Sequence, residues 1–263
     1  MTLSNHPVVQ AATHDSPRIV GHTHHERVTS TNDLARAAVS DGAPLAQLVS
    51  ADRQTAGRGR AGRPWTDDLD GPQGPANLAV SLAVETPYRS PGLVPLAAGL
   101  AVAAAYGALG AVPELKWPND VLLAGAKAAG ILVERHELAG HDVLIIGCGL
   151  DLDWRGVDRV GDAAAWTSLA EHLGRQVDRG EVLGALITAL DRELDALAAP
   201  AALLERYRDR CVTIGRQVRV VLPGGRLLDG RAVGVDAEGL LEVDTGGERV
   251  TVRAGDVSLS GAG

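Results

Sequence analysis

Cysteine is scarce in this sequence, and the spacing of its two cysteines argues against a cysteine-based metal site. Only two cysteines, Cys148 and Cys211, occur among 263 residues, and neither belongs to a CxxC pair or follows a histidine at metal-ligand spacing. A cysteine-based metal site is therefore not expected. We predict that both side chains are buried thiols.

Unbroken apolar runs are also missing. The longest candidate, residues 93–109, is interrupted by Pro95, Gly99 and Gly107, so it predicts a buried helix rather than a membrane span. Residues 1–16 are polar and contain no apolar export signal, which predicts a cytoplasmic protein that begins with a disordered lead over residues 1–17. The net charge of −8 disfavours nucleic acid as a partner.

What the chain does contain fits a soluble globular protein with a sizeable core. Hydrophobic residues make up 45% of the sequence and charged residues 22%. A length of 263 residues allows one large domain or a catalytic domain with a small appendage.

The most unusual stretch is residues 54–65, with the sequence QTAGRGRAGRPW. Its glycines let the backbone approach a ligand, and its arginines offer planar, permanently charged groups that match carboxylate or phosphate oxygens. The stretch follows an apolar strand predicted over residues 47–51, at the edge where α/β proteins commonly bind ligands. It predicts an anion-binding loop.

Three other interpretations of this loop are possible. A phosphate-binding P-loop would need Lys-Ser/Thr where Arg63-Pro64 stands, so the metal-binding hydroxyl is missing. Single-stranded nucleic acid would call for more aromatic residues than Trp65 alone. A solvated loop without a partner remains open at this point.

Polar residues occur at two further junctions. Ser30, Thr31 and Asn32 precede a helix predicted around residues 34–38, where they either cap the helix or also bind a ligand at its N-terminus. Asn119 and Asp120 follow a Trp-Pro step and either make a turn or place a charged pair near a site.

Lys127 and two glycines complete the candidate site. Lys127 interrupts a small, apolar predicted strand, so its ammonium needs either solvent or a negative partner. Gly147 and Gly149 lie in a central strand predicted over residues 143–151 and leave room for a flat ligand or another backbone. A solvated segment is favoured over a metal site for His22, His24 and His25.

Taken together, these segments resemble the biotin protein ligases. The matching pieces are Ser30-Thr31-Asn32, Gln54 with residues 57–65, the KWPND stretch at 116–120 and the KAAGIL stretch at 127–132. They occur in the order and spacing of that family, and the resemblance extends over residues 18–260. It implies an ATP-dependent enzyme that forms biotinyl-AMP and transfers biotin to a lysine of a carrier protein.

The resemblance also implies an α+β architecture. A catalytic domain similar to class II aminoacyl-tRNA synthetases, with a mixed sheet backed by helices, is expected over residues 18–211. A small SH3-like barrel is expected over residues 212–263. Short apolar runs separated by glycine turns at 223–225, 236–239 and 245–247 independently support hairpins in that tail.

Residue roles follow from the resemblance alone. Lys127, Arg60, Arg58 and Asp120 are implied to be catalytic, with Asp120 orienting or deprotonating the carrier amine. The residues implied for biotin are Ser30, Thr31, Asn32, Gln54, Arg58, Gly59, Arg60, Lys127 and Gly130. The residues implied for ATP or the adenylate are Arg58, Arg60, Arg63, Trp65, Lys116, Asn119, Asp120, Lys127, Gly149 and Asp151. Mg²⁺ is expected on the triphosphate, with no metal ligand assigned to the protein.

The sequence departs from the family at Asp151, where an asparagine close to the adenine is usual. An aspartate accepts hydrogen bonds from the adenine amine but donates none when ionised. Because the chain has no phenylalanine, Trp154 or Trp166 is the candidate to cover the adenylate.

The expected partner is the biotin carboxyl carrier protein or domain of a carboxylase. The chain is expected to act as a monomer or weak homodimer, without DNA or a membrane. About seventeen residues, expected to be unstructured, precede the region of resemblance that starts at residue 18, too few for a helix-turn-helix module. Lipoate or octanoate transfer enzymes of the same fold, and a non-catalytic biotin binder, remain the alternatives.

Overall fold

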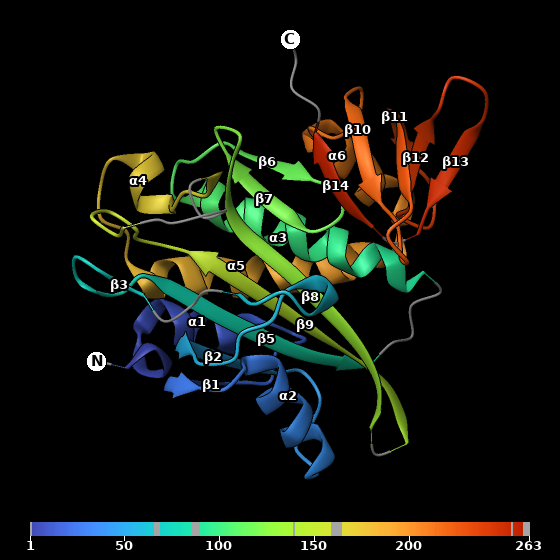
Figure 1. Ribbon diagram of the computed structural model, residues 1–263. Coiled ribbons are helices and arrows are strands. Elements are labelled where there is room, and N and C mark those ends of the chain that lie inside the picture. Colours follow the sequence, from blue (N-terminus) through green and yellow to red (C-terminus); the bar gives the residue numbers. More distant parts are fainter. Residues whose placement is uncertain are drawn as a thin grey trace.

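A seven-stranded mixed sheet forms the centre of the computed structural model, which describes residues 2–65, 69–85, 90–138, 140–158, 165–253 and 255–259 (Figure 1). The strand order is β1-β2-β5-β9-β8-β7-β6. β1 and β2 run parallel, and every other neighbouring pair is antiparallel. The strands are β1 (Gly21–Val28), β2 (Gln47–Gln54), β5 (Asn77–Glu85), β6 (Pro113–Lys116), β7 (Asp120–Leu123), β8 (Ala126–Leu138) and β9 (His141–Asp151).

Helices cover both faces of this sheet. α1 (Pro7–Asp15), α3 (Val94–Ala108), α5 (Arg179–Asp195) and α6 (Pro200–Arg210) contribute to the larger hydrophobic core on one face. α2 (Thr31–Ser40) packs on the other face through Ala35 and Val39, against Val49, Ala83 and Ile145. The predicted mixed sheet backed by helices is confirmed.

α3 is the apolar segment considered above. Residues Pro91–Ala108 are long and apolar enough to span a bilayer by composition, but 67% of that window is buried against the protein. A helix that is apolar on all sides is typical of a core position. The sequence-based prediction of a buried helix is therefore confirmed.

The N-terminus differs from the prediction. Residues expected to be a disordered lead form a short 3₁₀ turn, η1 (Leu3–Asn5), and α1, in which Val9 is 1% exposed. Pro7 at the first helical position favours this helix. α1 packs on α5 where Gly180 and Gly184 allow a close approach, since an added Cβ would come within 2.6 Å of His6 or Val8. These two glycines lie more than 170 positions after His6 and Val8 in the sequence, so no local pattern predicted the contact.

The C-terminal segment forms a separate five-stranded antiparallel sheet in the order β13-β12-β11-β10-β14. Four of its strands were predicted, and the fifth was not. α6 was also missed, because its polar composition hides its buried face. The strands are β10 (Gln217–Val221), β11 (Leu227–Val235), β12 (Leu241–Asp244), β13 (Arg249–Val252) and β14 (Asp256–Leu259). Residues 18–211 and 212–263 remain our proposed domain limits.

Trp117 connects this smaller sheet to the part of the chain that contains the central sheet. Its backbone N–H donates to Thr213 Oγ1 at 3.0 Å, and its indole Nε1 donates to the Gly239 carbonyl at 2.9 Å. The Trp117–Pro118 peptide bond is cis. These contacts tie the segment before β10 and the turn between β11 and β12 to the central sheet.

Local features agree with the residue types present. Ser168 and Glu171 form a capping box for α4 (Leu169–Leu173), as an S-x-x-E pattern indicates, and Asp178 caps α5. Two short strands, β3 (Asp70–Gly71) and β4 (Gly74–Pro75), pair as a hairpin. Cys148 and Cys211 are both buried and free.

His22 belongs to a buried polar cluster between β1 and β2. Its Nε2 lies 2.7 Å from Ser50 Oγ, and His24 Nδ1 lies 2.9 Å from the same oxygen. Burial, together with the charges of His24 and His25, lowers the pKa of His22 from 6.5 to about 4. No group of three or more metal-binding side chains occurs among the described residues, so the metal interpretation of these histidines has no support.

The lowered pKa of His22 predicts acid sensitivity. The folded protein holds His22 neutral, so its contribution is fully present above pH 6.5 and is lost as the pH falls towards 4. We expect this loss to reach about 3 kcal/mol of the free energy of unfolding. Urea titrations of His22→Asn should show a flatter dependence on pH over that window. The exposed His141→Asn is the control, and an unchanged slope for His22→Asn would contradict the assignment.

Candidate active site

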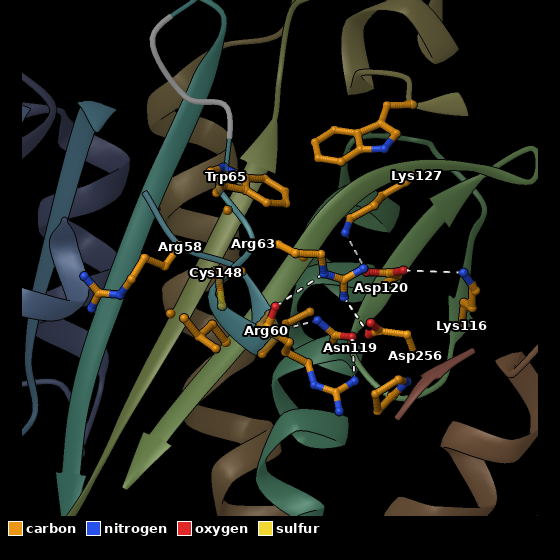
Figure 2. A pocket seen from close by; sticks show the side chains of 18 of the residues that line it. Arg58, Arg60, Arg63, Trp65, Lys116, Asn119, Asp120, Lys127, Cys148 and Asp256 are labelled. Carbon is orange, nitrogen blue, oxygen red and sulfur yellow. Dashed lines mark hydrogen bonds and ion pairs between the residues drawn. The ribbon is translucent and has the colours of Figure 1, made fainter. Parts of the chain in front are cut away.

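One cavity of about 780 Å³ lies where the arginine loop, β8, β9 and the β6–β7 turn meet β14 (Figure 2). Its size is in the range of small-molecule sites. All but one of the predicted site residues line it: Ser30, Thr31, Asn32, Gln54, Arg58, Gly59, Arg60, Arg63, Trp65, Lys116, Asn119, Asp120, Lys127, Gly130 and Gly149.

A polar recess forms one end of the cavity. The Thr31 backbone N–H donates to Gln54 Oε1 at 2.8 Å, which joins the start of α2 to the end of β2. Ser81 Oγ lies 2.7 Å from Thr31 Oγ1 and 2.6 Å from Asn32 Oδ1. Ser30 has no side-chain capping bond, so the capping interpretation does not account for it. These buried groups form a recess rich in donors and acceptors.

Lys127 and Asp120 meet in the middle of the cavity. Lys127 Nζ lies 2.7 Å from Asp120 Oδ1, and Lys116 Nζ approaches the other carboxylate oxygen at 3.8 Å. The ammonium also faces two indoles, 5.3 Å from the Trp65 ring and 5.0 Å from the Trp166 ring. The strand lysine therefore has the negative partner that its apolar context required.

Arg60 and Arg63 reach across to the C-terminal sheet. Arg60 Nη1 lies 3.5 Å from Asn119 Oδ1 and donates to the Gly255 carbonyl at 3.3 Å. Arg63 pairs with Asp256 at 2.6 Å. Burial lowers the pKa of the Arg60 guanidinium, and the carboxylates of Asp256 and Asp120 counter part of that effect. Arg60 and Lys127 thus face the same cavity (Figure 2).

Arg58 is oriented differently from the expectation. Its guanidinium makes a two-pronged contact with Asp33, at 2.8 Å for both nitrogens, and lies 3.6 Å from Glu134. Figure 2 shows it pointing away from the group formed by Lys127, Asp120 and Arg63. Arg58 lines the cavity without aiming its charge at the centre.

Two glycines of β9 make room for side chains of the protein itself. A Cβ on Gly149 would lie 2.4 Å from the Trp65 indole, and one on Gly147 would lie 2.3 Å from Asn32 Oδ1. The space that the glycines were predicted to leave is present. Trp65 and Asn32 fill it in this structure.

The close approach at Gly149 gives a testable consequence. Gly149→Ala should push Trp65 away from Trp166, whose ring centroid is 5.2 Å away. Because packed interiors tolerate little extra volume, we expect a red-shifted tryptophan emission and about a tenfold weaker affinity for a ligand bound in the cavity. Gly107→Ala is the control, because an added Cβ at that position would meet nothing within 4 Å. An emission spectrum and affinity identical to wild type would show that Trp65 is not held by this contact.

Asp151 is the predicted residue that the structure places elsewhere. It is fully buried at the end of β9, and it is absent from the cavity lining. The neighbouring Tyr106 hydroxyl donates to the Asp151 carbonyl at 3.4 Å. Trp154 is also buried, with its indole N–H directed to Asn77 Oδ1. Of the two tryptophans considered as a cover, only Trp166 lines the cavity.

Other cavity and neighbouring residues were missed by sequence reasoning. β14 contributes Asp256 and the residues up to Leu259, yet nothing in a short alternating strand indicates contact with a loop almost 200 positions earlier. Asp33 and Glu134 were not predicted to take part in the site. Ser81 lies in the apolar strand β5. A single polar residue among buried apolar ones was the only indication in the sequence that it has a polar partner.

Comparison with known proteins identifies the class to which this fold and site belong. The model of the Biotin/lipoate A/B protein ligase family matches residues 25–151, and the model of the Biotin protein ligase C terminal domain matches residues 213–260. These matches define an enzyme class that attaches biotin or lipoate to proteins.

Individual relatives narrow the class. The Biotin--[acetyl-CoA-carboxylase] ligase of Mycobacterium tuberculosis is 39% identical over 238 residues, covering 87% of this chain and 84% of the relative. The biotin protein ligase of Leishmania major in complex with biotinyl-5-AMP superposes with a TM-score of 0.59 at 26% identity, over 92% of this chain and 99% of the other. The biotin protein ligase of Aquifex aeolicus, solved with biotin and ATP, shares the fold with a TM-score of 0.77 at 24% identity, with the same coverage. The chain belongs to the biotin protein ligase family.

Proposed function

We propose that the cavity is where this chain makes biotinyl-AMP and passes the biotinyl group to a carrier lysine. As a member of its family, the protein is an ATP-dependent ligase that acts on biotin and a carboxylase carrier. The observation that supports the site assignment best is the convergence of Lys127 and Arg60 on one cavity with a polar recess at its end.

In the first step, a biotin carboxylate oxygen attacks the α-phosphorus of ATP and pyrophosphate leaves. Both reactants are anions, so cationic groups fixed in advance lower the barrier by offsetting their repulsion and the charge that develops. Lys127, held by Asp120, and Arg60 supply these charges. Mg²⁺ bound to the nucleotide substrate would help to neutralise the oxygens of the leaving pyrophosphate.

In the second step, the carrier's amine attacks the acyl carbon and AMP leaves with the bridging oxygen. The carrier lysine must lose a proton from its ammonium before it can attack. Asp120, the carboxylate nearest Lys127, is the group that we propose accepts this proton. Asp120 also holds Lys127, so its replacement affects both steps. This dual role is consistent with its place between two lysines.

The polar recess supports biotin over lipoate as the substrate. The ureido ring carries two N–H donors and a carbonyl acceptor, and the recess presents the hydroxyl and amide groups of Ser30, Thr31, Asn32 and Gln54. A site built for hydrogen bonding rejects a ligand that leaves these groups unpaired. The dithiolane ring of lipoate would do so.

Pyrophosphate release in the presence of ATP and Mg²⁺ tests the proposal. We expect release with biotin, no release with lipoate, and biotinylation of a carrier domain when one is added. Release with lipoate would favour the lipoate-transferring alternative. Biotin binding without any release would favour a non-catalytic binder.

We also propose that the enzyme is a cytoplasmic monomer or weak homodimer that needs neither DNA nor a membrane. Its carrier partner is the biotin carboxyl carrier protein or domain of a carboxylase. Sedimentation velocity of the wild-type protein with and without biotinyl-AMP is expected to show a single species near 27.2 kDa or a concentration-dependent dimer. A stable larger assembly would contradict this expectation.

A further inference from the structure

Arg58 forms a strap between three separate elements of the chain. It lies in the arginine loop, Asp33 lies in the first turn of α2, and Glu134 lies in β8. Each of the two terminal guanidinium nitrogens contacts one Asp33 oxygen at 2.8 Å, the bidentate geometry that makes an arginine pair both strong and directional. We call Arg58, Asp33 and Glu134 the arginine strap.

The charges in the strap reinforce one another. The hydrogen bonds from Arg58 hold the pKa of Asp33 below its usual value, and the bond to Asp33 raises the pKa of Arg58. The side chains are about one-third exposed, so salt screens the attraction in part. The strap is therefore suited to open and close rather than to lock permanently.

Glu134 connects the strap to the polar recess. One of its oxygens lies 3.6 Å from Arg58, and the other accepts a hydrogen bond from Asn32 Nδ2 at 2.7 Å. Asn32 Oδ1 in turn lies 2.6 Å from Ser81 Oγ. The same carboxylate thus touches the base of the loop and the group next to the vitamin subsite.

The loop itself transmits the position of Arg58 to its other arginines. Trp65 N–H donates to the Gly57 carbonyl at 2.9 Å, and Gly59 N–H donates to the Arg63 carbonyl at 2.7 Å. These bonds bring the two ends of the loop together. Fixing Arg58 at the base therefore sets where Arg60 and Arg63 lie.

We infer that Asp33 and Glu134 are positioning residues that hold the arginine loop over the cavity through Arg58, and so keep the reactive biotinyl-adenylate in the site until the carrier arrives. This consequence rests on the proposed function. A mixed anhydride is open to hydrolysis and to attack by any amine once water or bulk solvent reaches it. In this view Arg58 contributes to retention of the intermediate rather than to the chemical step.

Two measurements on Asp33→Asn test the inference. The first needs no ligand: trypsin cleavage within the loop, followed by mass spectrometry, should become about tenfold faster because the loop opens more often. The second measures escape of biotinyl-AMP as biotinylation of serum albumin. It should rise about tenfold while pyrophosphate release in a single turnover stays within about twofold of wild type, as expected for loss of one charge-assisted pair.

Matched variants separate a positioning role from general destabilisation. Asp142→Asn removes a carboxylate from a similar exposed pair with Arg135, and Arg36→Gln removes the other partner of Asp33 at 3.3 Å. Neither should change loop cleavage or adenylate escape. Glu134→Gln should act in the same direction as Asp33→Asn, and Asp33→Glu should restore part of the retention. Thermal melts should show that every variant is folded.

The inference is overturned if Asp33→Asn leaves loop cleavage and adenylate escape at wild-type rates, or if Asp142→Asn raises them equally. A wild-type enzyme that releases no pyrophosphate refutes the proposed function instead. The cleavage experiment still decides in that case whether the strap holds the loop.

Discussion

Replacing Lys127 with alanine is expected to lower the rate of biotinyl-AMP formation by about 10²- to 10³-fold, the range seen when a preorganised group that stabilises developing charge is removed. Lys127 supplies an ammonium 2.7 Å from Asp120, in a cavity walled by two indoles where water screens its charge poorly. Its loss also leaves the Asp120 carboxylate, beside two anionic substrates, with only the more distant Lys116 as a partner. Single-turnover pyrophosphate release at saturating biotin and ATP measures the effect.

Lys116 is the matched control for Lys127. It is also a cavity lysine near Asp120, but its distance of 3.8 Å makes the pair weaker. Lys116→Ala should therefore cost no more than about fivefold, in keeping with a pair worth up to about 1 kcal/mol. Equal losses for the two variants would mean that overall positive charge, rather than the position of Lys127, drives the first step.

Arg60→Ala is expected to have the second largest effect, about 10²-fold on adenylate formation together with faster escape of the intermediate. Arg60 is half-buried in the cavity beside Asn119 and the Gly255 carbonyl, so solvent screens its charge less than that of an exposed arginine. Rapid-quench measurements of adenylate formation, combined with the albumin assay, follow both steps.

Arg63 provides the comparison for Arg60 within the same loop. Its side chain is 59% exposed and pairs with Asp256, so solvent screens much of its charge. Arg63→Ala should cost about fivefold or less. If Arg63→Ala were the more damaging variant, the role assigned to Arg60 would belong to Arg63.

The sequence located several strands and most of the residues that line the cavity, because both leave marks in short stretches. Apolar runs located β2 and β9, and the pattern around Lys127 placed an ammonium in the apolar strand β8. The glycines of β9 indicated a close approach. Each of these signals is local, so one chain is enough to read it.

What escaped prediction depends on contacts between distant segments. α1 is stabilised by small residues of α5, and β14 completes the cavity from the far end of the chain. The orientation of Arg58 is decided by Asp33 and Glu134, two acids that no motif joins to the loop. Asp151 is buried outside the cavity lining, which its position in a motif could not reveal, and its role toward adenine stays a prediction.

The fate of one oxygen atom tests most directly whether a vitamin carboxylate meets the α-phosphorus in this cavity. Biotin labelled with ¹⁸O in its carboxylate, ATP, Mg²⁺ and a carrier domain would be incubated with the wild-type enzyme, and the products analysed by mass spectrometry. We predict one ¹⁸O in each AMP and none in pyrophosphate, and we expect Lys127→Ala to form this labelled AMP about 10²- to 10³-fold more slowly. Biotinylated carrier accompanied by unlabelled AMP would contradict the mechanism.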